Sequence, residues 1–403
     1  MKAPYLRLSP FKGLTYNSKK ISSFEDVLTP PYDVISSEEK QVFWKKSPYN
    51  FTHIDLGESY VKIGETFKTW TDDEILISSH EVSFYFCKES FNFNGKHERY
   101  GLISLVNIGS HIIPHEKTFL KYREDRLEVT KATGTQLSPI FGMFSHEENL
   151  LKNHYEKSLQ RIQPFIHFKE GTYTFEMWCV TDQKFFHELN EKLKNNKIYI
   201  IDGHHRYAVA EEYNKLIGSN NSQVMMYLVN QTEGGLLVLP THRAICHPEA
   251  CRQGRQYEGS RTDGFFAFAL NDSGGQVLPL LKGLSQLKNS STHIGVTYRE
   301  NPDKLHVLDP KEFSQYSPPA HLRWLEAKLS QSKIEKIHYI RGLPDHENAA
   351  LEDLKNGKFD VIFWVSPVSW DEFFKVIESG EVMPQKSTYF FPKILSGPVL
   401  YRF

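Results

Sequence analysis

The 403-residue sequence has few cysteines, almost no net charge and no long apolar run. Its four cysteines, Cys87, Cys179, Cys246 and Cys251, include no CxxC pair, so we interpret them as reduced thiols of a cytosolic protein. A formal net charge of −1 argues against duplex DNA or an anionic membrane as a partner. No apolar stretch approaches the roughly 20 residues that span a bilayer, and the first residues lack the apolar core of a signal peptide. We therefore expect a cytoplasmic protein that binds neither nucleic acid nor membrane.

The sequence also lacks the commonest short signatures of nucleotide-binding and hydrolytic enzymes. It contains no GxxxxGK[ST] loop, no GxGxxG turn and no GxSxG elbow. What it has is the composition of a globular protein, with 39% hydrophobic, 24% charged and 13% aromatic residues. A chain of this length can bury a large core.

Residue patterns predict a mixture of helices and strands. The expected helices are 36–47, 64–76, 123–137, 185–195 and 206–218, the first with Ser36 and Glu39 as a capping box. The expected strands include 50–56, 81–91, 99–108 and 138–144. This order of elements indicates an α+β, or mixed α/β, fold.

The stretch IYIIDGHHRYAVAE (198–211) carries the strongest chemical signal. A buried strand runs into Asp202, Gly203 and two histidines, and a helix then begins near Arg206. Gly203 would let the chain turn tightly beside a ligand, and the helix N-terminus and guanidinium would attract phosphate oxygens. Asp202 would hold a divalent cation that bridges phosphates. Two alternatives are an Asp202 that only caps the helix, and a zinc site on the histidines.

Two further charged segments are candidates for the same site. In IIPHEKTFLKYREDR (112–126), Glu116 follows a strand end, where a carboxylate could accept a proton from a hydroxyl nucleophile. The alternative is an ordinary charged loop followed by a solvated helix face. In LPTHRAI (239–245), three polar side chains interrupt an apolar strand: Thr241, His242 and Arg243. Burying Arg and His costs free energy unless they have an anionic partner. An ion pair with Asp202 or Glu116 is the structural alternative.

Eight motifs in order resemble a long-uncharacterised microbial family that contains the pyrophosphate-dependent serine kinases. They are TPPYDVIS, SPYNFTHIDLG, IPHEKT, EDRL, LSPIF, IYIIDGHHRY, LPTHR and MPQKSTYFFPK, and together they extend over nearly the whole chain. The DGHHR turn further resembles free serine kinases that use ADP, which share a core with the ParB partition protein and sulfiredoxin. The resemblance implies a ParB/sulfiredoxin-like catalytic core at 111–250, with 145–197 as an insertion, between α/β regions at 1–110 and 251–403.

The resemblance also implies roles for individual residues. The phosphate-binding residues would be Gly203, His204, His205, Arg206 and Arg243. Asp202 would bind Mg²⁺ or assist as a base, and Glu116 would be the general base on the serine hydroxyl. The remaining substrate-binding candidates are His115, Lys117, Arg126, Thr241 and His242. Where the family has Glu-Thr-Ala after the DGHHRY motif, this chain has Ala208-Val209-Ala210, and it has TGTQ (133–136) where the family has an Asn. Both departures are expected beside the pocket.

The resulting expectation is an enzyme that transfers a phosphoryl group reversibly from pyrophosphate to free L-serine, with Mg²⁺ as cofactor. Two alternatives remain open at this point. One is a kinase or nucleotidase on the same fold that uses ADP or ATP, and the other is a ParB-like module that responds to nucleotides without catalysis.

Overall fold

The computed structural model describes residues 5–115, 120–219, 222–246, 276–290, 293–330, 334 and 336–403. The chain forms two compact units, one of Met1–Leu236 with Pro392–Phe403 and the other of Leu237–Phe391. This division does not follow the three expected regions, because residues 1–110 and most of 111–250 share one unit. Both units combine helices with sheets, so the mixed α+β class is confirmed.

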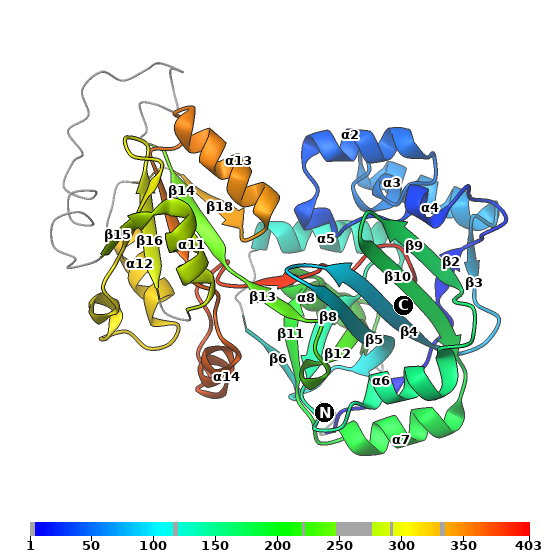
Figure 1. Ribbon diagram of the computed structural model, residues 1–403. Helices are drawn as coiled ribbons and strands as arrows, with labels where there is room; N and C mark the ends of the chain where they lie inside the picture. Colours follow the sequence, from blue (N-terminus) through cyan, green and yellow to red (C-terminus); the bar gives the residue numbers. More distant parts are fainter. Residues whose placement is uncertain are drawn as a thin grey trace. The chain divides into compact units, whose positions relative to one another are not determined.

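The first unit is built on a nine-stranded mixed sheet (Figure 1). Its strands run in the order β6 (Ile112–Pro114), β11 (Ile198–Asp202), β8 (Ile140–Phe144), β12 (Gln223–Asn230), β5 (Lys96–Asn107), β4 (Phe84–Asn92), β10 (Tyr173–Val180) and β9 (Ile166–Glu170), with β1 (Leu8–Ser9) on β5. β11 is parallel to β6 and antiparallel to β8, with an irregular register between Ile200 and Asp202. The expected insertion at 145–197 supplies β9 and β10 to this same sheet.

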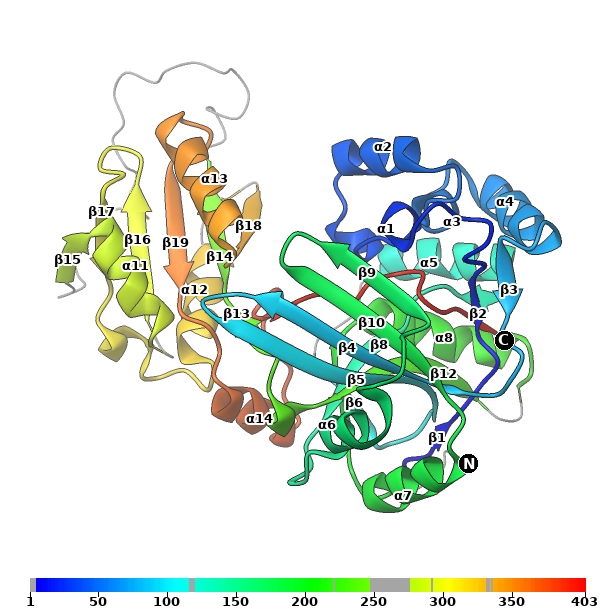
Figure 2. The ribbon, with the colours of Figure 1, turned by 45° about the vertical axis from the view of Figure 1, so that its right-hand side comes forward.

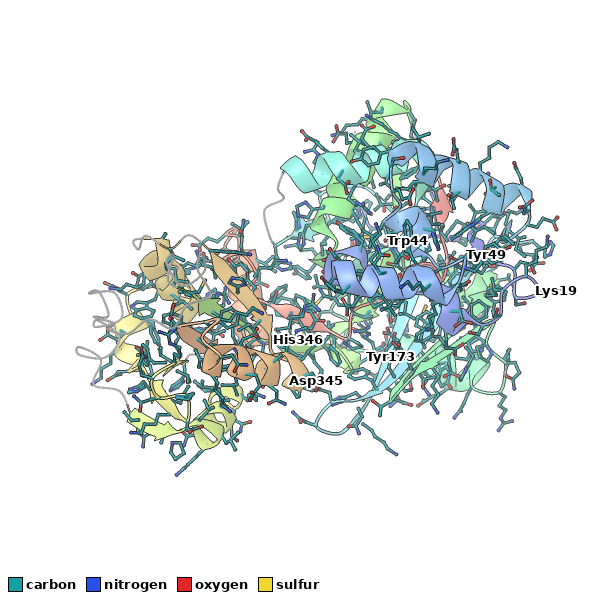
Figure 3. The ribbon with its side chains drawn as sticks, turned by 90° about the horizontal axis from the view of Figure 1, so that it is seen from above. Lys19, Trp44, Tyr49, Tyr173, Asp345 and His346 are labelled. Atoms are coloured by element: carbon teal, nitrogen blue, oxygen red, sulfur yellow. The ribbon has the colours of Figure 1, made fainter. Side chains whose placement is uncertain are left out.

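Helices cover both faces of this sheet. α6 (Leu150–His154) and α7 (Gln183–Leu193) lie on one side, and α5 (Leu120–Thr133) and α8 (His204–Leu216) on the other (Figure 2). The N-terminal helices are α1 (Phe24–Val27), α2 (Ser37–Lys46), α3 (Thr52–Asp55) and α4 (Tyr60–Asp72). Aromatic contacts join α2, α3 and α4: Trp44 stacks on His53 at 4.6 Å between centroids, and Tyr49 meets Trp70 edge-on at 6.0 Å. Figure 3 labels Trp44 and Tyr49 in this region. Two short pairs, β2 (Leu14–Tyr16) with β3 (Leu76–Ser78) and β7 (Thr135–Gln136) with β21 (Tyr401–Arg402), complete the unit.

Two local expectations need correction. Residues 50–56 were expected as a strand, but Thr52–Asp55 is helix α3. The buried Asn50 side chain accepts hydrogen bonds from the backbone N–H and the hydroxyl of Thr52, and such local bonds compete with strand pairing. Cys87 and Cys179 are free thiols, but Cys246 is disulfide-bonded, so the expectation of four reduced cysteines is wrong.

The second unit has its own six-stranded sheet, in the order β15 (Gln276–Pro279), β17 (Lys304–Val307), β16 (Ile294–Tyr298), β19 (Val361–Val365), β14 (Thr241–Ile245) and β18 (Ile337–Arg341). Its helices are α11 (Leu280–Lys288), α12 (Ala320–Ser330), α13 (Pro344–Lys355) and α14 (Trp370–Glu378). A separate pair joins β13 (Leu237–Leu239) to β20 (Tyr389–Phe391). No helix in the described part of the chain has the length and hydropathy of a bilayer span.

Candidate phosphate-binding site

The DGHHR turn joins β11 to α8 through a left-handed glycine. Gly203 has φ +86° and occupies the N-cap position of α8, where no side chain caps the helix. The alternative in which Asp202 is merely a helix cap is therefore wrong. A Cβ at position 203 would lie 2.9 Å from Nε of Arg206, so a larger residue would also displace the guanidinium. The N-terminus of α8 is therefore not capped by the side chain of its N-cap residue, and such a position suits an anion.

Asp202 lies between two cations. Its Oδ1 accepts a hydrogen bond from Nζ of Lys393 at 2.6 Å, and its Oδ2 accepts one from Nη2 of Arg206 at 2.7 Å. Burial alone would raise the pKa of this carboxyl, but Lys393 and Arg206 together hold it well below its usual range. Arg206 also donates from Nη1 to the carbonyl of Pro139. Asp202 thus stays ionised and fixes the position of both cations.

Two histidines beside the turn, His204 and His115, have defined partners within the fold. Nε2 of the buried His204 accepts the backbone N–H of His115 at 3.3 Å, and the two rings meet edge-on with centroids 4.5 Å apart. Nδ1 of His115 lies 2.5 Å from the carbonyl of Ile200. Burial, followed by the nearby His115, lowers the pKa of His204 well below its usual value. His204 is therefore neutral, and it ties the end of β6 to the start of α8. His205 follows in the first turn of α8 and is half-buried.

A cavity opens beside this turn. It has about 420 Å³ of empty space, its opening to solvent included. The polar residues that line it are Tyr32, Asp55, Arg126, Gln136, Ser138 and Arg206. Val209, Ala210 and Gln136 also line it, so both departures from the family pattern lie at the cavity, as expected.

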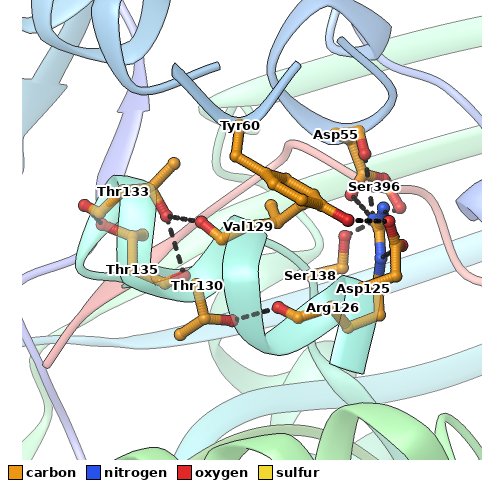
Figure 4. A network of polar contacts seen from close by, with 10 residues as sticks. All are labelled: Asp55, Tyr60, Asp125, Arg126, Val129, Thr130, Thr133, Thr135, Ser138 and Ser396. Atoms are coloured by element: carbon orange, nitrogen blue, oxygen red, sulfur yellow. Dashed lines mark hydrogen bonds and ion pairs between the residues drawn. The ribbon is translucent and has the colours of Figure 1, made fainter. Parts of the chain in front are cut away.

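Arg126 crosses from α5 to the N-terminal helices at one wall of the cavity (Figure 4). Its Nη1 donates to the carbonyl and to Oδ1 of Asp55, each at 2.9 Å. Its Nε donates to Oδ2 of Asp125 at 2.8 Å, and the guanidinium lies 4.3 Å from the centroid of the Tyr32 ring. The expectation of a solvated helix face is wrong for this residue, whose side chain is buried. Its partner Asp55 has a pKa that burial raises and that Arg126 and Arg206 lower in part.

Most of the chain matches the model of a known family. Residues 8–318 match the model of DUF1015, a family described as proteins of unknown function. The chain belongs to the DUF1015 family. No curated protein matches the sequence. Solved structures with some likeness include a free serine kinase in complex with AMP, which is 14% identical with a TM-score of 0.36 over 70% of this chain and 83% of that one.

Two more solved structures are similar to the same degree. A C-terminally truncated SbnI from Staphylococcus aureus is 14% identical, with a TM-score of 0.40 over 74% of this chain and 86% of that one. A conserved hypothetical protein from Pyrococcus furiosus is 14% identical, with a TM-score of 0.36 over 72% and 90%. Similarity at this level does not assign a function.

Three expected site residues belong to the second unit. They are Thr241, His242 and Arg243, and they lie on β14. His242 pairs with Glu347 at 3.3 Å, and Arg243 donates to the carbonyls of Thr241 and Gln385. Their assignment to substrates stays a prediction. Glu116 and Lys117 lie outside the described residues, so the placement of both stays a prediction as well.

Sequence reasoning missed several residues of the cavity and its surroundings. Asp55 and Tyr32 line the cavity, and Lys393 binds Asp202, yet none of them was singled out. Each of the three lies inside a segment that carried the family resemblance: HIDLG, PPYDV and FFPK. Segments that are far apart in the sequence thus contribute to one site. Their place in motifs of the family resemblance is the feature of the sequence that could have identified these three residues.

The residues at the turn do not offer a ready metal site. Both carboxylate oxygens of Asp202 already accept hydrogen bonds from cations. Among the described residues, no group of three or more His, Cys, Asp or Glu side chains is arranged to hold a metal ion, which also gives no support to the zinc alternative. Mg²⁺ in phosphoryl-transfer sites is often held by one or two carboxylates together with substrate phosphates. The expected Mg²⁺ stays a prediction, and we derive no step through it.

Proposed function

We propose that this protein is a phosphotransferase that moves a phosphoryl group from pyrophosphate to the hydroxyl of free L-serine, giving O-phospho-L-serine and phosphate. One observation carries the proposal. The motifs that resemble the pyrophosphate-dependent serine kinases contribute Tyr32, Asp55, Arg126, Ser138 and Arg206 to a single cavity. That cavity adjoins a helix N-terminus with an anion-binding geometry, so the residues behind the resemblance gather at one site rather than being scattered over the fold.

The donor phosphates would bind at the turn. Arg206 and Lys393 both pair with the carboxylate of Asp202. Arg206 donates one N–H of Nη1 to Pro139 and one of Nη2 to Asp202, and a guanidinium has five N–H groups. A guanidinium beside the N-terminus of α8 suits the oxygens of a small polyanion.

The chemistry requires little covalent help from the protein. The serine hydroxyl oxygen forms a bond to one phosphorus of pyrophosphate, the bond from that phosphorus to the bridging oxygen breaks, and the hydroxyl proton passes to a base. Asp202 is a poor base because its cationic neighbours lower its pKa far below neutrality. We therefore assign the base to Glu116, which follows β6 in the sequence. The positive charge at the turn would stabilise the transferring group.

The choice of pyrophosphate over a nucleotide rests on the resemblance of the eight motifs to the pyrophosphate-dependent serine kinases. A nucleotide donor remains the alternative that experiment must decide.

A donor series tests the proposal. Purified protein is incubated with Mg²⁺, L-serine and either pyrophosphate, ADP or ATP, and O-phosphoserine is measured by mass. We expect saturable product formation with pyrophosphate. Product formed only with a nucleotide would refute the donor assignment, and no product with any donor would refute the function.

Arg206 provides a test within the site, with Arg123 as a matched control. Arg206→Ala removes a cavity-lining guanidinium, so the KM for pyrophosphate should rise at least about tenfold, since one charge-assisted hydrogen bond contributes about 1.5–3 kcal/mol. Arg123→Ala removes a partly exposed arginine that pairs with Glu212 outside the cavity, and the KM should change less than about twofold. Equal effects of the two variants would remove Arg206 from the donor site.

A further inference from the structure

The wall of the cavity opposite in charge to the DGHHR turn is formed around Asp55. Arg126 lies between Asp55 and Asp125, so one guanidinium serves two carboxylates and leaves one negative charge in excess. Arg206, the arginine of the DGHHR turn, and Asp55 both line the cavity. Charges of opposite sign therefore lie on its walls.

Asp55 retains hydrogen-bonding capacity toward the cavity. Arg126 contacts its carbonyl and Oδ1, and in the described part of the chain no hydrogen bond reaches the second carboxylate oxygen, Oδ2. An ionised carboxylate has about four lone-pair sites, so an oxygen of a residue that lines the cavity can accept further hydrogen bonds. Asp125 holds Nε and Nη2 of Arg126, and Tyr32 lies under its guanidinium, so Arg126 is fixed in its present contacts. A donor that enters the cavity could therefore bond to Asp55.

We propose that Asp55 binds the protonated amino group of the acceptor, so that this site selects free amino acids over hydroxy acids and N-acylated amino acids. The inference rests on the proposed function and assigns the substrate class of the same cavity. An ammonium group fits because it brings three N–H donors and one positive charge to a wall that has an excess carboxylate. Arg126 is then a positioning residue, which orients Asp55 and opposes the rise in its pKa that burial causes.

The experiment compares L-serine with 3-hydroxypropionate, which is serine without its amino group. For wild-type protein with pyrophosphate we expect kcat/KM to favour serine by about 10- to 100-fold, the range that one charged hydrogen bond provides. Asp55→Asn keeps the shape but loses the charge, so it should lower kcat/KM for serine by about the same factor and leave that for 3-hydroxypropionate within about twofold. Asp33→Asn is the control, because Asp33 is an exposed carboxylate that acts on Asp55 through space but does not line the cavity. It should keep the preference for serine.

Two outcomes would overturn the inference: a wild-type enzyme that treats both acceptors alike, or an Asp55→Asn variant that keeps the preference for serine. If Asp55→Asn does not fold, Asp55→Glu replaces it. This variant should keep the preference for serine over 3-hydroxypropionate but raise the KM for serine. An unchanged KM for serine would count against the inference. Calorimetric titration with L-serine and with 3-hydroxypropionate separates this inference from the proposed function. If no donor gives phosphoserine, the proposed function is refuted. Tighter binding of serine than of 3-hydroxypropionate, lost in Asp55→Asn, would still support the role of Asp55 in binding the amino group. Equal binding of the two compounds would refute that role.

Discussion

Replacing Asp202 by asparagine is the most informative perturbation of the site. Asp202→Asn keeps the size of the side chain but removes the charge that lies between Arg206 and Lys393. Both cations are largely buried, with side chains 8% and 13% exposed, so neither is easily solvated in place. Removing one partner of a buried ion pair typically costs about 3–5 kcal/mol. We expect a loss of about that size in the free energy of unfolding at pH 7.

The measurement is urea-induced unfolding followed by circular dichroism, fitted with two transitions because the chain has two compact units. Lys393→Met supplies the second arm of a double-mutant cycle, because it removes one cation and leaves the pair with Arg206 intact. The double variant should be more stable than the sum of the single effects by about 0.5–3 kcal/mol. A loss below about 1 kcal/mol for Asp202→Asn, or strict additivity, would refute the account of the turn.

The same variant has a pH signature with a definite sign. The pKa of Asp202 is lowered in the folded protein from an ordinary value of 3.8, so its stabilising effect is present above about pH 4 and is lost as the pH falls through the folded pKa. The difference in stability between wild type and Asp202→Asn should therefore be constant from about pH 5 to 8. It should narrow only below about pH 4. A difference that changed near neutrality would point to another group.

Three further changes test the turn and the chemistry. Gly203→Ala places a Cβ at φ +86° and 2.9 Å from Nε of Arg206, so it should destabilise the protein by about 1–3 kcal/mol and raise the KM for pyrophosphate; Gly218→Ala, at φ +65° with nothing nearby, should cost stability alone. Glu116→Gln should lower kcat by about 10²–10⁴-fold without loss of fold by circular dichroism, and turnover within a few-fold of wild type would exclude Glu116 as the base. Chelation with EDTA should abolish phosphoserine formation and added Mg²⁺ should restore it; activity that persists in EDTA would remove magnesium from the reaction.

Local patterns predicted the elements that depend on neighbouring residues. Ser36 and Glu39 form the expected capping box on α2, and Gly218, which follows α8, has the left-handed conformation that glycine favours at a helix end. The strand, turn and helix at 198–216 follow the same logic, because the apolar run IYII and the flexible Gly203 act over a few residues. The segment at 50–56 shows the limit of such patterns. Its alternation predicts a strand, but the side chain of Asn50 accepts hydrogen bonds from the backbone N–H and the hydroxyl of Thr52, and a helical turn forms at Thr52–Asp55 instead.

The sequence by itself determined the α+β class and the strand, glycine and helix at 198–216, and its motifs pointed to the family. Only the tertiary structure decided which side chains share a cavity. Asp55 lies on α3, Arg126 on α5 and Arg206 on α8, and Lys393 returns from a segment 191 residues beyond Asp202 to bind it. Spacing along the chain does not predict such contacts, because they depend on how β11 and its helices pack and on which buried charges pair. For the same reason the buried His242 pairs with Glu347 within the second unit.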